Sequence, residues 1–215
     1  MTDTTTNPTT EPMTNPAVST AFKPVSAAFK PLIAVGPEYA EQAAAAEARL
    51  QEALAEAVAA PSGFRFGPVQ SAARDLPGAS IVRIIPGFAL QEHAPTHVMV
   101  LTLKQAVRQA LSLPLGDEEF WDRVEETLTG AFVGLADQLD APHLVLHTSD
   151  EGTRYDYHLL FALQDEATEG FLYVVAFCVH VTVGLDRDRL LGLAVTDPAP
   201  YTLGLDAVCV RMPAA

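Results

Sequence analysis

The spacing of apolar residues predicts three helices in the first two-thirds of the chain. From Pro37 to about residue 60, apolar side chains recur every three or four positions, with glutamates between them. The same period predicts a second helix within 96–113 and a third from about 117 to 139. Prolines and Pro-Gly pairs interrupt residues 64–94, so this region is expected to hold only a short helix near 69–75.

The apolar period changes from 3.6 to 2 after Pro142, which is typical of β-strands. Strands are predicted over 143–148, 154–164, 171–184, 190–196 and 201–210, with a shorter one over 31–36. Since short turns connect the later strands, they are expected to pair antiparallel. Their second faces are small and mostly apolar, so both faces of the sheet should be covered. The predicted fold is α/β, of the α+β type: a three-layer α-β-α sandwich in which two helical layers wrap a central antiparallel sheet.

The N-terminal segment differs in composition from the rest of the chain. Residues 1–20 contain eight threonines and three prolines but almost no large apolar side chain. We therefore expect a flexible Thr/Pro-rich tail over 1–30 and a single domain over 31–215. The start also lacks the basic residues and apolar run of a secretory signal peptide. A soluble protein that is stored, or exported by a non-classical route, is expected.

The charge balance narrows the choice of partners. The 215 residues include 13 Lys and Arg against 27 Asp and Glu, giving a net charge of −14. Most of this surface would repel a nucleic-acid backbone. For the same reason, binding to anionic lipid through a polybasic patch is not expected. The charge does not exclude neutral, zwitterionic lipid as a partner.

Candidate chemical groups are few. Three pairs have suggestive spacing: His93 with His97, His143 with His147, and Cys178 with His180. The first two pairs lack further ligands, so no metal site is predicted. Cys178 and His180 share a strand face, and a small core thiol beside a partly buried histidine is favoured over a hydrolase nucleophile–base pair. No catalytic residue and no cofactor is predicted, and an enzyme is not expected.

Two histidines predict a response to pH. If His158 and His180 are buried in the neutral form, their protonation near about pH 5–6 should lower stability and loosen the helical cover.

The predicted strands are unusually long. At about 3.3 Å per residue, strands of 10 to 14 residues span roughly 35–45 Å, whereas a membrane-spanning strand needs only about 9–11 residues. An ordinary buried sheet is one interpretation. The other is a sheet that stays soluble beneath detachable helices and later enters lipid.

Three stretches of the chain resemble the Cyt family of cytolytic δ-endotoxins, in the same order. TLKQAVRQALSLPLGDEEFWDRVEETLTGAF (102–132) resembles the helix pair of the family, with Pro114, Asp117 and Trp121 at the connection. YDYHLLFALQDEATEGFLYVVAFCVHVTV (155–183) resembles its two longest strands, and LLGLAVTDPAPYTL (190–203) the following strand and bend. LIAVGPEYAEQAAAAEARLQEAL (32–54) is similar to its first strand and helix. Together the four stretches cover about half the chain.

The resemblance implies a function. Cyt proteins bind lipid directly and permeabilise membranes without enzymatic chemistry, so a membrane-binding, pore-forming cytolysin that acts outside the producing cell is implied. Members are often activated by trimming of their termini. A homo-oligomer on membranes and a dimer in solution are also implied. The alternative is a non-lytic lipid- or acyl-binding virulence factor on the same fold.

The same resemblance assigns candidate residues. The large side chains of the two longest strands are the candidates for contact with the membrane: Tyr155, Tyr157, Leu159, Phe161, Phe171, Tyr173, Val175, Phe177, Val179 and Val181. One Cyt-like protein carries a fatty acyl chain on a cysteine, and this resemblance makes Cys178 and Cys209 candidates for acylation.

Overall fold

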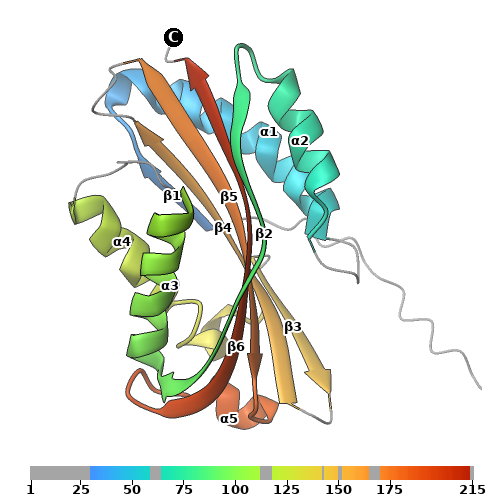
Figure 1. Cartoon of the computed structure of the whole chain (residues 1–215), viewed down its shortest axis with the longest axis vertical. Helices are drawn as coiled ribbons and strands as arrows, with labels where there is room; N and C mark the ends of the chain where they lie inside the picture. Colours follow the sequence, from blue (N-terminus) through green and yellow to red (C-terminus); the bar gives the residue numbers. More distant parts are fainter. Residues whose placement is uncertain are drawn as a thin grey trace, which may run out of the picture.

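The later strands of the chain form the centre of the fold in the computed structural model, which describes residues 30–58, 64–111, 118–141, 143–149, 152–164 and 170–213. Within these ranges, six strands make one sheet (Figure 1). They are β1 (Lys30–Ala34), β2 (Ser80–Pro95), β3 (Leu144–Ser149), β4 (Gly152–Gln164), β5 (Phe171–Val183) and β6 (Pro198–Pro213).

The sheet has the order β1-β4-β5-β6-β2, and β3 also pairs with β4. β3 and β1 share the outer edge of β4: β3 pairs with residues 152–157 and β1 with residues 159–163. The predicted antiparallel pairing is confirmed for β3 to β6, and β2 joins β6 in the same sense. The short first strand is the exception, because β1 runs parallel to β4.

In the described part of the chain, four longer helices and several short ones accompany the sheet. They are η1 (Pro37–Tyr39), α1 (Ala40–Val58), α2 (Phe66–Asp75), α3 (Thr96–Leu111), α4 (Glu118–Thr129), η2 (Leu135–Gln138) and α5 (Arg187–Leu191). Among the described residues, no helix combines the length and the apolar character needed to cross a membrane.

Two separate apolar clusters hold the helices to the sheet. Odd-numbered residues of β4 to β6 pack with α3 and α4, through side chains such as Met99, Leu103, Trp121 and Leu128. Even-numbered residues of the same strands pack with α1 and α2, through side chains such as Leu50 and Val69. Side chains alternate across a strand, so the odd-numbered residues of β4 to β6 form one face of the sheet, the odd face, and the even-numbered residues form the other, the even face. A mixed α+β fold with one sheet is thereby confirmed.

The even face is apolar along only part of its length. Its buried contacts with α1 and α2 come from residues 160–162 of β4, 172–178 of β5 and 208–212 of β6. Beyond these positions the even-numbered residues become polar, beginning with His158, His180 and Asp206. We call this part of the sheet the polar end of the even face.

Three sequence predictions are wrong in detail. Residues 80–95 form the long strand β2, because Pro86-Gly87 makes a bulge within the strand and does not end it. Residues 190–196 do not form a strand, since α5 and a turn occupy this stretch. The third helix ends at Thr129, where a turn and η2 follow. The predicted tail lies outside the described residues, apart from Lys30, which begins β1.

Candidate functional site

A cluster of charged side chains occupies the polar end of the even face. The strand register builds it, because Asp156 of β4 lies directly opposite His180 of β5, and Cys178 of β5 lies opposite Asp206 of β6. Gly204 lies opposite His180, where a Cβ atom would stand 3.3 Å from the His180 Cβ. The missing side chain leaves room for the imidazole to reach across β6.

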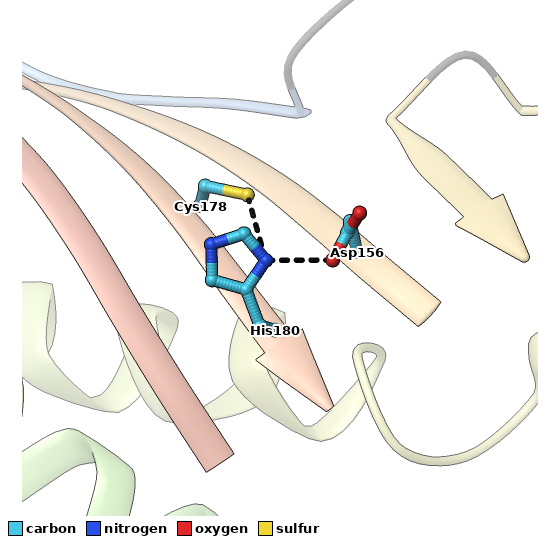
Figure 2. A group of neighbouring side chains, drawn as sticks. All are labelled: Asp156, Cys178 and His180. Atoms are coloured by element: carbon cyan, nitrogen blue, oxygen red, sulfur yellow. Dashed lines mark hydrogen bonds and ion pairs between the residues drawn. The ribbon is translucent and has the colours of Figure 1, made fainter. Parts of the chain in front are cut away.

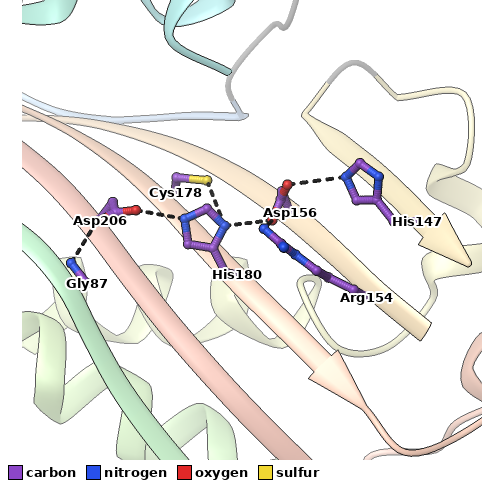
Figure 3. Close-up of polar contacts among 7 residues, drawn as sticks. All are labelled: Gly87, His147, Arg154, Asp156, Cys178, His180 and Asp206. Atoms are coloured by element: carbon purple, nitrogen blue, oxygen red, sulfur yellow. Dashed lines mark hydrogen bonds and ion pairs between the residues drawn. The ribbon is translucent and has the colours of Figure 1, made fainter. Parts of the chain in front are cut away.

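His180 is held between two carboxylates. Its Nδ1 lies 2.6 Å from Oδ1 of Asp156, and its Nε2 lies 2.8 Å from Oδ2 of Asp206 (Figure 3). A ring that serves two carboxylate acceptors carries a proton on both nitrogens. The three side chains therefore join β4, β5 and β6 through two charge-assisted hydrogen bonds.

Further groups fix the two carboxylates. Nε2 of His147, on β3, lies 3.4 Å from Oδ2 of Asp156, and a guanidinium nitrogen of Arg154 lies 3.6 Å from Oδ1 of Asp156. The backbone N–H of Gly87 donates to Oδ1 of Asp206 at 2.7 Å. Gly87 has a φ of 63° at the β2 bulge, a conformation that favours glycine. The bulge thus supplies a donor to the cluster.

Electrostatics agrees with this geometry. Burial alone would lower the pKa of His180, but its hydrogen bonds to Asp156 and Asp206 outweigh burial and raise that pKa well above the usual range. Burial would raise the pKa of Asp156, yet hydrogen bonds from His147 and His180 lower it below the usual range. The prediction that His180 is buried in the neutral form is therefore wrong. Burial does lower the pKa of His158, to about 4, so this side chain is neutral.

The Cys178–His180 pair is unsuited to nucleophilic catalysis. Sγ of Cys178 lies 3.7 Å from Nδ1 of His180 (Figure 2), and burial raises the pKa of the thiol to about 11. A general base needs a free lone pair, but both ring nitrogens of His180 already donate to carboxylates. The hydrolase hypothesis therefore loses its base in this arrangement.

The structure does not bring the other histidine pairs together. His93 lies near the end of β2 and His97 lies in the first turn of α3, so their spacing crosses a strand–helix junction. Nε2 of His143 lies 3.1 Å from Oε1 of Gln138, whereas His147 contacts Asp156.

The candidates for membrane contact lie together on the odd face of β4 and β5. All of them except the half-buried Phe171 are buried beneath the helical layer of α3 and α4. Reaching lipid with this face requires the two helices to leave it.

A small number of polar contacts connect that helical layer to the strands. The hydroxyl of Tyr155 donates to the carbonyl of Ala131, in the turn after α4, at 2.8 Å. The hydroxyls of Thr96 and Tyr201 lie 2.7 Å apart. Arg123 of α4 donates to the carbonyl of Ile33 in β1 at 2.9 Å. Arg83 of β2 also donates to the carbonyl of Ala110 in α3 at 2.7 Å. The buried side chains at this interface are largely apolar.

The two cysteines are both inaccessible in this conformation. Cys178 and Cys209 are each 1% exposed, and burial raises the pKa of the Cys209 thiol to about 12. Acylation of either thiol would need the surrounding sheet to open first.

Sequence reasoning missed the two carboxylates of the cluster. One signal was visible in the sequence: the even positions Arg154, Asp156 and His158 are all polar, a pattern that could have indicated a polar end on one face of this strand. Nothing local in the sequence links that pattern to Asp206, about fifty residues later.

Comparisons with known proteins define the class of this chain. A family model described as Bacillus thuringiensis toxin matches residues 20–213. The chain therefore belongs to this toxin family, and the resemblance to Cyt δ-endotoxins is confirmed.

Three relatives illustrate the similarity. The Type-2Aa cytolytic delta-endotoxin of Bacillus thuringiensis subsp. kyushuensis is 29% identical over 67% of this chain and 56% of its own length. The Type-2Bb cytolytic delta-endotoxin of subsp. jegathesan is 28% identical over 86% of this chain and 69% of its own length. The crystal structure of the activated Cyt2Ba monomer from subsp. israelensis has a TM-score of 0.75 and 26% identity, covering 86% of this chain and 97% of that one. The chain thus spans little more than half the length of the Type-2Aa relative.

Proposed function

We propose that this chain is a cytolysin that binds lipid bilayers directly and permeabilises them without enzymatic chemistry. One observation carries the proposal: in a chain of the cytolytic toxin family, β4 and β5 present a continuous large apolar face beneath α3 and α4. In water the fold is a three-layer α-β-α sandwich that hides this face. At the membrane, α3 and α4 move away and lipid replaces them.

The dimensions of the strands support insertion. β4 and β5 contain 13 residues each, which corresponds to about 43 Å at 3.3 Å per residue. The hydrocarbon core of a bilayer is about 30 Å thick. Either strand is long enough to cross it while tilted.

The helical cover is suited to release because its attachment is mainly apolar. Apolar contacts have no directional requirement, so acyl chains can replace the side chains of α3 and α4 on the odd face. Lipid cannot replace the buried hydrogen bonds at Tyr155 and Tyr201. The bond from Arg123 to Ile33 is exposed, so water can replace it. We infer that the two buried bonds are the specific restraints on the cover.

The lipid partner follows from charge. A net charge of −14 disfavours anionic membranes, so zwitterionic lipid is the proposed target. Edge strands such as β2 could also pair between molecules on the bilayer, which would give a homo-oligomer there.

Dye leakage from phosphatidylcholine vesicles tests the proposal. The full chain and a chain beginning at Lys30, which keeps β1, are added between about pH 5 and pH 8. Leakage by either form supports the proposal. Absence of both leakage and vesicle binding for both forms rejects it, and lipid that copurifies with a non-lytic protein favours the lipid-binding alternative.

A matched pair of substitutions tests which face meets lipid. Phe171→Asp places a charge at the half-buried start of β5 on the odd face, and Leu101→Asp places one on α3, where Leu101 is 43% exposed. Phe171→Asp should slow leakage by up to about fivefold, because a charge near the end of a membrane strand costs up to about 1 kcal/mol. Leu101→Asp should leave leakage unchanged, and the reverse order would assign insertion to the helices.

A further inference from the structure

Three potential metal ligands meet at the polar end of the even face. Sγ of Cys178, a ring nitrogen of His180 and a carboxylate oxygen of Asp156 all lie within 4.8 Å of one another (Figure 2). Thiolate, imidazole and carboxylate are the three ligand types that zinc uses in proteins. All three side chains stand on paired strands in the middle of the sheet, so their positions are fixed by backbone hydrogen bonds.

Two of the ligand–ligand distances lie within about 0.7 Å of those in a tetrahedral site. With Zn–S of about 2.3 Å and Zn–N or Zn–O of about 2.0–2.1 Å, tetrahedral angles place S and N about 3.5 Å apart and N and O about 3.3 Å apart. Sγ of Cys178 lies 3.7 Å from Nδ1 of His180. Nδ1 lies 2.6 Å from Oδ1 of Asp156, because a proton now joins these atoms. Binding would separate them by about 0.7 Å, which a carboxylate rotation provides.

Neighbouring groups hold the three ligands by hydrogen bonds and ion pairs, as in known metal sites. Metal-binding histidines usually donate their second N–H to a carboxylate, a backbone carbonyl or a water molecule. Nε2 of His180 lies 2.8 Å from Oδ2 of Asp206. Asp206 in turn accepts from the backbone of Gly87. The second oxygen of Asp156 contacts His147 (Figure 3).

We propose that Asp156, Cys178 and His180 bind one divalent metal ion of the zinc type, with Asp206 orienting His180. Binding releases two protons, one from Sγ of Cys178 and one from Nδ1 of His180, and forms bonds from the metal to Sγ, Nδ1 and Oδ1. Without metal, two aspartates face the His180 and Arg154 cations. With metal, an ion of charge +2 and Arg154 face two aspartates and a thiolate. Net charge is zero in both states, so occupation leaves no uncompensated charge in the sheet.

The ion can reach this position from solvent. The side chains of His180 and Asp156 are 18% and 12% exposed, and the neighbouring Arg154 and His147 are about half exposed. A solvent molecule would complete the fourth position. The site uses the even face, so it is independent of the odd face to which membrane activity is assigned.

Cobalt binding to the full, metal-stripped chain tests the site. Co²⁺ bound to a thiolate gives a charge-transfer absorption band, which reports the sulfur ligand directly. The matched variants are Cys178→Ala and Cys209→Ala, since Cys209 is equally buried but belongs to the odd face. Zinc competition against a coloured chelator then gives the affinity, the stoichiometry and the number of protons released.

The expected result is one metal per chain, about two protons released, and a thiolate band that Cys178→Ala abolishes and Cys209→Ala keeps. Asp206→Asn should weaken zinc binding by about 10- to 100-fold, as outer-shell substitutions do. The absence of a thiolate band in the wild-type chain overturns the proposal even if a variant fails to fold. A band lost in Cys209→Ala and kept in Cys178→Ala overturns it as well.

Discussion

Removing the Tyr155 hydroxyl should loosen the helical cover of the odd face. Tyr155 is fully buried in β4, and its O–H donates to the carbonyl of Ala131 at 2.8 Å. Tyr155→Phe keeps the ring and its packing, and deletes only this bond. The Ala131 carbonyl then stays buried without that donor.

The size of the effect follows from the burial of both partners. A neutral hydrogen bond contributes about 0.5–1.5 kcal/mol, and a buried acceptor that loses its donor costs about 1–3 kcal/mol. We therefore expect Tyr155→Phe to lower the free energy of unfolding by about 1.5 kcal/mol. For a chain of this length, that corresponds to a fall of about 3–6 °C in Tm. If the bond must break before the helices leave, the leakage rate should rise by about tenfold.

The assay compares two variants of similar stability. Val174→Ala removes two methyl groups from a fully buried side chain on the even face, under α1 and α2. At about 0.8 kcal/mol per buried CH₂, its transfer cost is about 1.6 kcal/mol, before any contribution from the cavity. Urea unfolding measures stability, and dye release from phosphatidylcholine vesicles measures the rate of permeabilisation.

Two results would refute this reasoning. Equal acceleration in Tyr155→Phe and Val174→Ala would mean that general destabilisation, and not release of α3 and α4, controls leakage. An unchanged leakage rate in Tyr155→Phe, at reduced stability, would mean that this bond is still intact when the membrane is breached.

Three further predictions concern stability. Burial lowers the pKa of His158 from its ordinary value of 6.5 to about 4, although the neighbouring carboxylate of Asp156 acts in the opposite direction. The neutral ring of His158 therefore favours the folded state above about pH 6.5. The free energy of unfolding should fall by about 3 kcal/mol as the pH drops to 4. Urea midpoints of metal-free protein should show this acid loss, and His158→Gln should reduce it; a flat wild-type profile contradicts it. Gly152→Ala should destabilise the fold by on the order of 1–3 kcal/mol in thermal unfolding, because Gly152 has a φ of 141° and a Cβ atom there would lie 2.6 Å from the backbone oxygen of Val183. The control Gly67→Ala should not destabilise the fold, since the space around Gly67 is open. Lys104→Met should cost about 1 kcal/mol of stability, because Lys104 is only 15% exposed and pairs with Glu125 of α4. Arg49→Met should cost less, because Arg49 is 49% exposed. Equal costs in urea unfolding would contradict the role of burial.

The sequence by itself determined the local elements and the apolar faces. The 3.6-residue period located α1 and α3 within a few residues of their ends, and the period of two located β4 and β5. These patterns are readable because a helix or strand must turn its apolar side chains toward one core, whatever else the chain does. The resemblance to cytolytic toxins depends on the same patterns.

At two places a local signal in the sequence predicts the wrong element. Pro86-Gly87 looks like a strand break, yet β2 continues through it, because the pairing with β6 tolerates one bulged residue. Residues 190–196 look like a strand, but Asp186 caps a short helix there and accepts from the backbone N–H of Arg189 at 3.0 Å.

Only the tertiary structure decided how distant residues meet. Cys178 and His180 share a strand face by spacing alone, whereas Asp156 and Asp206 join them through the register of β4 on β5 and of β5 on β6. A shift of one residue in either pairing would turn these carboxylates to the opposite face. Register depends on the sum of all contacts across the sheet, and therefore no local pattern contains it. For the same reason, the charge of His180 was unpredictable until both of its partners were in place.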